Sequence, residues 1–241
     1  ENDSGPNTGG MGSYSDHDHL LPFVSQNDLD ISSSIMREVV HALKEEFGEG
    51  YRGILYGQFM LAKSLREEKP SPKLVEFNCR FGDPEAMNVL PILTEDSDLA
   101  DICARITDGS LKQRHVSFQR KATVCKYLVP SDYPEHPVAG QTILVDEGAV
   151  VSKGAQLYYA SVDLIDGRIV TTASRAIGLV GIRDTIEAAE RVAEAATEDV
   201  NGPLRHRKDI GTAPLLQKRI DHMRLLGAGV PIAKEPQVGI A

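Results

Sequence analysis

The sequence predicts an α+β fold in which helices flank antiparallel sheets, and three observations support this prediction. Apolar residues repeat with helical spacing between Asp28 and Phe47. An apolar run at residues 53–62 and a strand at 73–79 flank a polar segment, as in a hairpin. Beyond Arg114 the chain becomes a series of short strands. With 241 residues, 41% of them hydrophobic, the chain can bury a substantial core.

The first helix and the hairpin are indicated by their periodicity. The helical face repeats every fourth position, at Ile31, Ile35, Val39, Leu43 and Phe47, and Gly48 ends the helix. Residues 53–62 are almost continuously apolar, which favours a buried central strand. The return strand at 73–79 alternates apolar and polar side chains.

The remaining elements follow from capping signals and turns. A second helix at 96–107 is expected to bury Leu99, Ile102, Cys103 and Ile106. Strands are expected near 121–129, 142–146, 157–165 and 168–174, with Asp166-Gly167 as the turn between the last two. Asp184 and Glu187 predict a capping box for the next helix, and a last helix covers about 215–226.

Composition and charge exclude several classes of function. With 26 basic and 35 acidic residues, the net charge of −9 argues against nucleic acid as a partner. No apolar run reaches the ~20 residues of a membrane span, and the polar N-terminus does not resemble a signal peptide. We therefore expect a cytoplasmic protein without a membrane partner. The three cysteines lack CxxC spacing and are expected to be reduced and partly buried.

The N-terminal segment is rich in glycine. Four glycines occur in the eight residues Gly5-Pro-Asn-Thr-Gly-Gly-Met-Gly12, so backbone N–H groups can approach an anionic ligand closely. The alternative is a purely structural turn. Because the chain starts with Glu1 and enters this loop at once, we expect a fragment of a longer protein. The segment Ser15-Asp-His-Asp-His19, in which Asp and His alternate, is interpreted as a solvated loop.

Two polar side chains on the return strand form a candidate metal site. The period of two places Glu76 and Asn78 on the same face, opposite Val75 and Phe77. A carboxylate and an amide oxygen favour Mg²⁺ or Mn²⁺ over zinc. The alternative is an edge strand whose polar face lies in water.

Charged residues continue beyond this strand. Asp83 is expected to cap a helix that starts at Pro84. Arg80 beside such a helix start suits a phosphate or carboxylate, whereas Asp83 and Glu85 suit an amine. The alternative is an ordinary cap and a surface arginine. The basic run at 205–208 is interpreted as a solvated patch or, alternatively, an anion site.

Three of these segments together carry a family resemblance. The glycine-rich loop at 5–12, the run Glu76-Phe-Asn-Cys-Arg-Phe-Gly-Asp-Pro-Glu85 and the run Arg207-Lys-Asp-Ile-Gly211 resemble, in this order, the signatures of the phosphoribosylamine–glycine ligases, also called glycinamide ribonucleotide synthetases. The resemblance extends to about Ile220. It implies the C-terminal part of an ATP-grasp fold, followed by a small β-rich domain with flanking helices.

The resemblance implies ATP-dependent ligation of glycine to 5-phosphoribosylamine in purine biosynthesis, through glycyl phosphate. It assigns Mg²⁺ or Mn²⁺ to Glu76 and Asn78, and catalytic contacts to Arg80, Asp83 and Glu85. Substrate contacts fall to Arg207, Lys208 and the loop residues Asn7, Thr8, Gly9, Gly10 and Met11. It divides the chain into residues 1–114, 115–226 and a tail at 227–241.

Family members carry an N-terminal portion that is not seen before Glu1, so the isolated chain is expected to be inactive unless that portion is supplied. Two alternatives remain. Another ATP-grasp carboxylate–amine ligase or carboxylase would share the metal strand but not the run at 207–211. A non-catalytic binding fragment would need none of these side chains to act on ATP.

Overall fold

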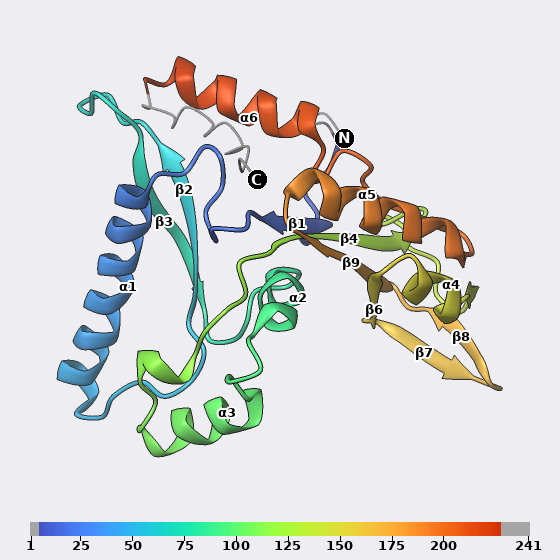
Figure 1. The fold of residues 1–241 in the computed structure, drawn as a ribbon, viewed down its shortest axis with the longest axis horizontal. Helices are drawn as coiled ribbons and strands as arrows, with labels where there is room; N and C mark the ends of the chain where they lie inside the picture. The colour runs from blue at the N-terminus through green and yellow to red at the C-terminus, as the bar shows by residue number, and fades with distance from the viewer. Residues whose placement is uncertain (1–4, 228–241) are drawn as a thin grey trace, which may run out of the picture. The chain divides into compact units, whose positions relative to one another are not determined.

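A computed structural model describes residues 5–227 of the chain (Figure 1). The chain divides into two compact units. The first, here called the β-rich unit, comprises Glu1–His19, Gly82–Asp98 and Gln113–Leu215. The second, the hairpin unit, comprises Leu20–Phe81, Leu99–Lys112 and Leu216–Ala241. Each unit contains segments that are distant in sequence. The expected domain boundary between residues 114 and 115 stays a prediction. The proposed tail, apart from Gly227, lies outside the described residues.

A five-stranded antiparallel sheet forms the centre of the β-rich unit. Its strands lie in the order β1 (Gly12–Ser15), β4 (Ala122–Pro130), β9 (Ile177–Arg183) and β6 (Ala155–Tyr159), and β11 (Leu204–Arg205) also pairs with β4. Every residue of β4 is buried. The expected α+β class with antiparallel sheets is thus observed.

Strand β9 is central to this sheet, yet the sequence did not predict it. Gly178 and Gly181 interrupt its apolar residues, and glycines weaken a strand signal. A Cβ on Gly181 would overlap the carbonyl oxygen of Ala189 in α5 (Ile186–Ala196). A Cβ on Gly178 would lie 2.7 Å from Sδ of Met87 in α2 (Glu85–Val89). Because positions 178 and 181 point to opposite faces, the two helices cover opposite faces of the sheet.

A second sheet completes the β-rich unit. Its order is β10 (Val200–Asn201), β5 (Thr142–Val145), β8 (Arg168–Thr171) and β7 (Val162–Ile165), and α4 (Glu147–Ser152) follows β5. The single strand predicted at 157–165 was wrong, because β6 ends at Tyr159 to pair with β9 while β7 pairs with β8. The predicted turn is confirmed, with positive φ at Asp166 (49°) and Gly167 (74°).

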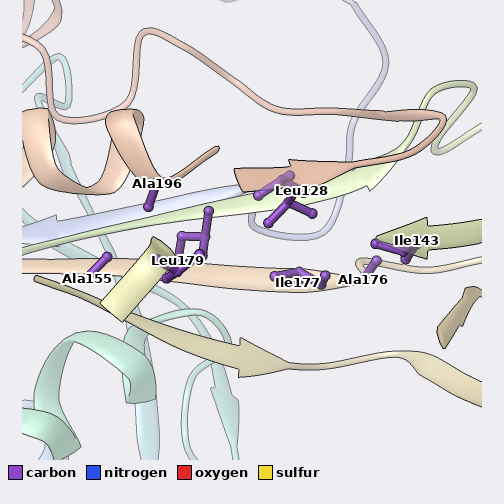
Figure 2. Close-up of a cluster of buried hydrophobic side chains, with 9 residues drawn as sticks. Leu128, Ile143, Ala155, Ala176, Ile177, Leu179 and Ala196 are labelled. Carbon is purple, nitrogen blue, oxygen red and sulfur yellow. The ribbon is translucent and has the colours of Figure 1, made fainter. Parts of the chain in front are cut away.

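One buried apolar cluster connects the two sheets (Figure 2). Its members come from β4, β5, β6, β9 and β10, from the helices α4 and α5, and from Ala176, which precedes β9. They are Leu128, Ile143, Val150, Ala155, Ala176, Ile177, Leu179, Ala196 and Val200. Full burial of a leucine or isoleucine side chain stabilises a fold by about 1.5–3 kcal/mol, so this cluster is a major source of stability.

The start of α5 differs from the prediction. Thr185, not Asp184, is its N-cap, and the Thr185 side chain accepts a hydrogen bond from the Ala188 N–H. Asp184 instead pairs with Lys121, with 2.5 Å between Oδ1 and Nζ. Helix α5 buries Ile186, Ala189, Ala193 and Ala196.

The hairpin unit contains α1 (Gln26–Phe47), the strands β2 (Tyr56–Ala62) and β3 (Ser71–Asn78), and α3 (Leu99–Asp108). Ser25 and Asp28 form a reciprocal capping box at the start of α1, and Gly48 ends the helix with φ at 74°. Helix α1 packs against the hairpin, where a Cβ on Gly57 would lie 2.5 Å from Sδ of Met36. The boundary between the units falls within α6 (Ala213–Leu225).

Two burial predictions in the hairpin unit were wrong. Residues 53–62 were expected in a buried central strand, but Met60 in β2 is 58% exposed. The reason is that β2 pairs only with β3 within residues 5–227, and α1 covers the face that carries Gly57. In α3 only Ile102 is buried, whereas Leu99 and Cys103 are exposed. All three cysteines are free, but Cys79 is also exposed and Cys125 alone is buried.

Among the helices of residues 5–227, none combines the length and the apolar character that a bilayer span requires.

Candidate functional site

Three charged or polar side chains at the end of β3 form a connected network. The Asn78 Nδ2 group donates a hydrogen bond to Oε1 of Glu76 at 3.0 Å, which confirms that the two side chains share a face. Arg80 donates from Nη2 to Oδ1 of Asn78 at 3.2 Å and from Nη1 to the Phe81 carbonyl at 2.8 Å. The hairpin unit therefore brings Glu76, Asn78 and Arg80 together.

The pairing of β3 explains why this network faces away from α1. Glu76 lies opposite Gln58 and Asn78 opposite Tyr56, on the face of the hairpin that does not carry Gly57. A register shift between Gln58 and Phe59 leaves Val75 as the extra residue of a bulge. Bulges re-aim neighbouring side chains and are frequent next to functional sites.

The donor set at the end of β3 suits a hard divalent cation. Glu76 is exposed, and its carboxylate accepts a hydrogen bond from the amide Nδ2 of Asn78, whose Oδ1 accepts from Arg80. In the described part of the chain, no group of three or more His, Cys, Asp or Glu side chains could hold a metal ion. A cation on Glu76 and Asn78 would thus complete its shell with water or phosphate oxygens, which is how Mg²⁺ is usually bound.

Asp83 occupies a different position from the one predicted. It does not cap α2, because that helix begins at Glu85 and Pro84 takes the N-cap position without a side-chain hydrogen bond. The Asp83 carboxylate instead accepts from the Tyr127 hydroxyl at 2.8 Å and from Nη2 of Arg175 at 2.7 Å. The Asp83 carboxylate is therefore oriented by two side chains of the β-rich unit and not by the N–H groups of α2.

The guanidinium of Arg175 donates hydrogen bonds to several acceptors. Its Nη1 donates to the carbonyl oxygens of Gly10 at 2.8 Å and of Asp83 at 3.0 Å. The guanidinium also lies 4.9 Å above the ring of Tyr127. Burial, reinforced by the hydrogen bond to Asp83, raises the pKa of Tyr127, so the phenol stays a donor at neutral pH.

These side chains open onto a pocket within the β-rich unit. The pocket has a volume of about 330 Å³ and is lined by Asp83, Tyr127, Ala160, Ser161, Ser174 and Arg175. Sequence reasoning identified only Asp83 of this set. Tyr127 sat inside a predicted apolar strand, and Arg175 belonged to no motif, so the sequence held no signal for either residue.

The glycine-rich loop is anchored to the same region. The Gly9 N–H donates to the Tyr133 hydroxyl at 3.2 Å. A Cβ on Gly10 would lie 2.6 Å from Cδ of Pro84, so this glycine is needed for packing. Met11 is 6% exposed, so its side chain belongs to the core and leaves only the backbone for a ligand. The exposed residues Asn7 and Thr8 stay predicted substrate contacts.

Two models of one protein family match this chain. The ATP-grasp (A) domain of phosphoribosylglycinamide synthetase matches residues 1–86, and the C domain of the same synthetase matches residues 123–213. The chain belongs to the phosphoribosylglycinamide synthetase family.

Curated relatives and a solved structure agree with this family. The chain is 52% identical over 226 residues to the phosphoribosylamine–glycine ligase of Methanocaldococcus jannaschii, covering 94% of this chain and 49% of the relative. It is also 52% identical over 226 residues to the ligase of Methanosarcina barkeri, covering the same shares. The crystal structure of the ligase from Thermotoga maritima matches with a TM-score of 0.70 at 27% identity, over 86% of this chain and 48% of that one. The chain therefore spans about half the length of the relatives that it matches.

The basic run at 205–208 forms hydrogen bonds with the rest of the fold, although Arg205 and Lys208 are exposed. Arg205 donates to the carbonyls of Ser131 and Tyr133, and His206 contacts Glu194 at 3.1 Å. Arg207 forms a two-pronged pair with Asp209, and its hydrogen bonds lower the pKa of that carboxyl. The carbonyl of Lys208 accepts from Nζ of Lys126 at 3.0 Å. Substrate binding by Arg207 and Lys208 stays a prediction.

Within residues 5–227, the Asp and His residues at 16–19 belong to no group of three or more such side chains that could hold a metal ion. His17 pairs with Asp16, and Nε2 of His19 lies 3.0 Å from the Gln119 carbonyl oxygen. The first contact lies within the loop, and the second joins the loop to the segment that precedes β4.

Proposed function

We propose that this chain acts as part of a ligase that joins glycine to 5-phosphoribosylamine with hydrolysis of ATP to ADP and phosphate. The observation that carries the proposal is the network of Glu76, Asn78 and Arg80 at the end of β3, in a chain that matches both synthetase domain models. The product is glycinamide ribonucleotide, a precursor in purine biosynthesis.

The reaction consists of two transfers. A carboxylate oxygen of glycine attacks the γ-phosphorus of ATP, so the bond between that phosphorus and the β,γ-bridging oxygen breaks and ADP leaves. The amine of 5-phosphoribosylamine then attacks the carbonyl carbon of glycyl phosphate, loses a proton and expels inorganic phosphate. Neither transfer needs a nucleophile from the protein, so positioning and charge stabilisation are the protein's main contributions.

Glu76 and Asn78 would hold a divalent cation through their side-chain oxygens. When bound there, Mg²⁺ or Mn²⁺ would neutralise charge on the nucleotide phosphates. Asn78 donates its amide N–H to Glu76 and accepts from Arg80 at Oδ1, so the two side chains share one face, and the Asn78 amide would turn to direct its oxygen to a cation beside Glu76. The residues therefore fit the cation by their oxygen chemistry.

Arg80 would bind an anion, either the transferring phosphoryl group or glycyl phosphate. Two of its N–H groups already contact Asn78 and Phe81, which fixes the plane of the guanidinium. A guanidinium offers five donors, so others remain for a phosphate oxygen. Convergence of Arg80 with Asp83 and Glu85 stays a prediction, because these residues belong to different units.

The test uses a hybrid ligase, which is this chain joined to the half of the Methanocaldococcus jannaschii relative that it does not match. The assay follows formation of glycinamide ribonucleotide and release of phosphate from ATP, with glycine and 5-phosphoribosylamine as substrates. We expect the hybrid to make product and the 241-residue chain alone to make none.

The controls separate the alternatives. Omission of glycine or of 5-phosphoribosylamine should abolish product formation by the hybrid. A hybrid that consumes ATP with another carboxylate or amine, but not with these, would favour a different ATP-grasp ligase. A hybrid that binds ATP without turnover would favour a non-catalytic fragment. Robust turnover by the chain alone would contradict the need for a second half.

A further inference from the structure

The pocket beside Asp83 contains a carboxylate that is held from two sides. We infer that Asp83 binds the ammonium group of glycine, and that Arg175 and Tyr127 are positioning residues that fix its carboxylate for this contact. The inference rests on the proposed ligase function and identifies which part of which substrate this pocket receives. It assigns roles to Arg175 and Tyr127, which lie outside all three sequence signatures.

Tyr127 and Arg175 hold the Asp83 carboxylate but leave some of its hydrogen-bond acceptor sites unused. Oδ1 accepts from the Tyr127 hydroxyl, and Oδ2 accepts from Nη2 of Arg175. An ionised carboxylate has about four acceptor sites, so roughly half of them remain. The Asp83 side chain is 48% exposed, whereas that of Arg175 is 17% exposed and Tyr127 is buried. The Asp83 carboxylate is thus accessible to a ligand, while the two side chains that hold it are packed into the fold.

The chemistry of the pocket favours a zwitterion that brings its own ammonium. The formal charges of Asp83 and Arg175 cancel, so a ligand without net charge adds no uncompensated charge. The other polar lining groups are the hydroxyls of Ser161 and Ser174. A primary ammonium offers three donors and no acceptor, which matches an acceptor-only carboxylate and hydroxyl oxygens. About 330 Å³ is ample space for a ligand as small as glycine.

The reaction itself distinguishes the two amines. The amine of 5-phosphoribosylamine must be unprotonated to attack, and a neighbouring carboxylate would favour its protonated form. The amino group of glycine takes no part in either transfer, and protonation prevents it from attacking glycyl phosphate. Asp83 therefore suits glycine and would impede the other amine.

Arg175 connects this carboxylate to the glycine-rich loop. Its Nη1 bonds both the Gly10 carbonyl and the main-chain carbonyl of Asp83, so one side chain fixes two backbone segments and a carboxylate. A lysine would offer a point charge without the planar fork and could not satisfy the three acceptors in the same geometry.

The experiment compares four variants of the hybrid ligase: Asp83→Asn, Arg175→Lys, Tyr127→Phe and, as a matched control, Arg191→Lys. Arg191 also pairs with a carboxylate, that of Glu187, but on the exposed surface of α5. KM is measured separately for glycine, 5-phosphoribosylamine and ATP, and thermal unfolding is followed for each variant. Calorimetry measures glycine binding without turnover, and glycolate serves as a competitor that lacks the ammonium group.

We expect Asp83→Asn to raise the KM and the dissociation constant of glycine by about tenfold or more, the typical loss for a hydrogen bond to a charged group. Arg175→Lys and Tyr127→Phe should raise the same constants by a smaller factor. The KM values of ATP and 5-phosphoribosylamine should stay within about twofold. Asp83→Asn should also reduce the preference for glycine over glycolate, whereas Arg191→Lys should change none of these values.

Two results would overturn the inference. One is unchanged glycine affinity in Asp83→Asn; the other is an equal rise in all three KM values together with a lower melting temperature, which would indicate a structural role. Failure of the proposed function looks different, because the unsubstituted hybrid would then make no product. Glycine binding by calorimetry would still decide the inference in that case, since wild-type and Asp83→Asn proteins can be compared directly.

Discussion

The β-rich unit and the hairpin unit differ in how their polar networks are supported. In the β-rich unit, strands β4 and β9 bury residues such as Val124 and Leu179 completely. In the hairpin unit, the buried hydrophobic side chains among the described residues are Ile102 and Met223, while Val75 and Met60 are more than half exposed. The candidate cation residues thus stand on a lightly packed hairpin, whereas the Asp83 pocket stands on a deep core.

The two units also differ in how deeply their charged side chains are buried. Lys126 in β4 is fully buried, with its Nζ 2.6 Å from Glu190 and 2.5 Å from Glu194. Glu76 in β3 is exposed and has hydrogen bonds within its own strand end. A buried cluster of this kind stabilises the fold only while it is complete, whereas the exposed network can change with little effect on folding. We therefore expect substitutions in the buried cluster to lower stability, and substitutions in the exposed network to lower activity.

The largest expected effect breaks the buried cluster. Lys126→Met leaves Glu190 and Glu194 without their cation and should lower the free energy of unfolding by about 3–5 kcal/mol. Denaturant unfolding of the chain measures this change. As a control, Lys121→Met removes an exposed pair with Asp184 and should cost at most about 1 kcal/mol. Equal effects of the two substitutions would contradict the comparison.

A second pair of substitutions compares the apolar surfaces of the two units. Leu179→Ala in β9 should cost about 2–5 kcal/mol, because this side chain is fully buried in the cluster of Figure 2. Leu74→Ala in β3 should cost about 1 kcal/mol or less, because Leu74 is 37% exposed. The same denaturant experiment tests both. A larger loss from Leu74→Ala would mean that the hairpin holds a core of its own.

A smaller effect concerns acid stability. Burial alone would raise the pKa of Glu194, but hydrogen bonds from Lys126 and His206 outweigh it and lower this pKa below 4.5. Since the folded pKa is lower than the unfolded one, this carboxylate contributes stability above pH 4.5 that is lost as pH falls through the folded pKa. Glu194→Gln should therefore flatten the loss of stability below pH 4.5. An unchanged acid profile would show that other carboxylates determine it.

Local patterns predicted the parts of the fold that depend on neighbouring residues. The periodic apolar face predicted α1, and the Asp166-Gly167 dipeptide predicted the turn between β7 and β8. The alternation of β3 also placed Glu76 and Asn78 on one face. Strand β9 was missed because its glycines are required by α2 and α5, which arrive from elsewhere in the chain.

The Asp83 pocket was beyond prediction for the same physical reason. Asp83 has an ideal local signal for a helix cap, yet its partners lie 44 residues away at Tyr127 and 92 residues away at Arg175. Contacts over such separations depend on the order of strands in the sheet. A single sequence carries no record of that order, so the local cap was the natural but wrong interpretation.

The central claim is that Glu76 and Asn78 serve the chemistry and contribute little to folding. The most direct measurement is turnover of the hybrid ligase carrying Glu76→Gln, as a function of Mg²⁺ concentration, beside Glu45→Gln on the exposed surface of α1. We predict that Glu76→Gln lowers turnover by about a hundredfold or more at limiting Mg²⁺ while the free energy of unfolding changes by about 0.5 kcal/mol or less. Glu45→Gln should leave both quantities unchanged. Near-normal turnover by Glu76→Gln at limiting Mg²⁺ would contradict the claim.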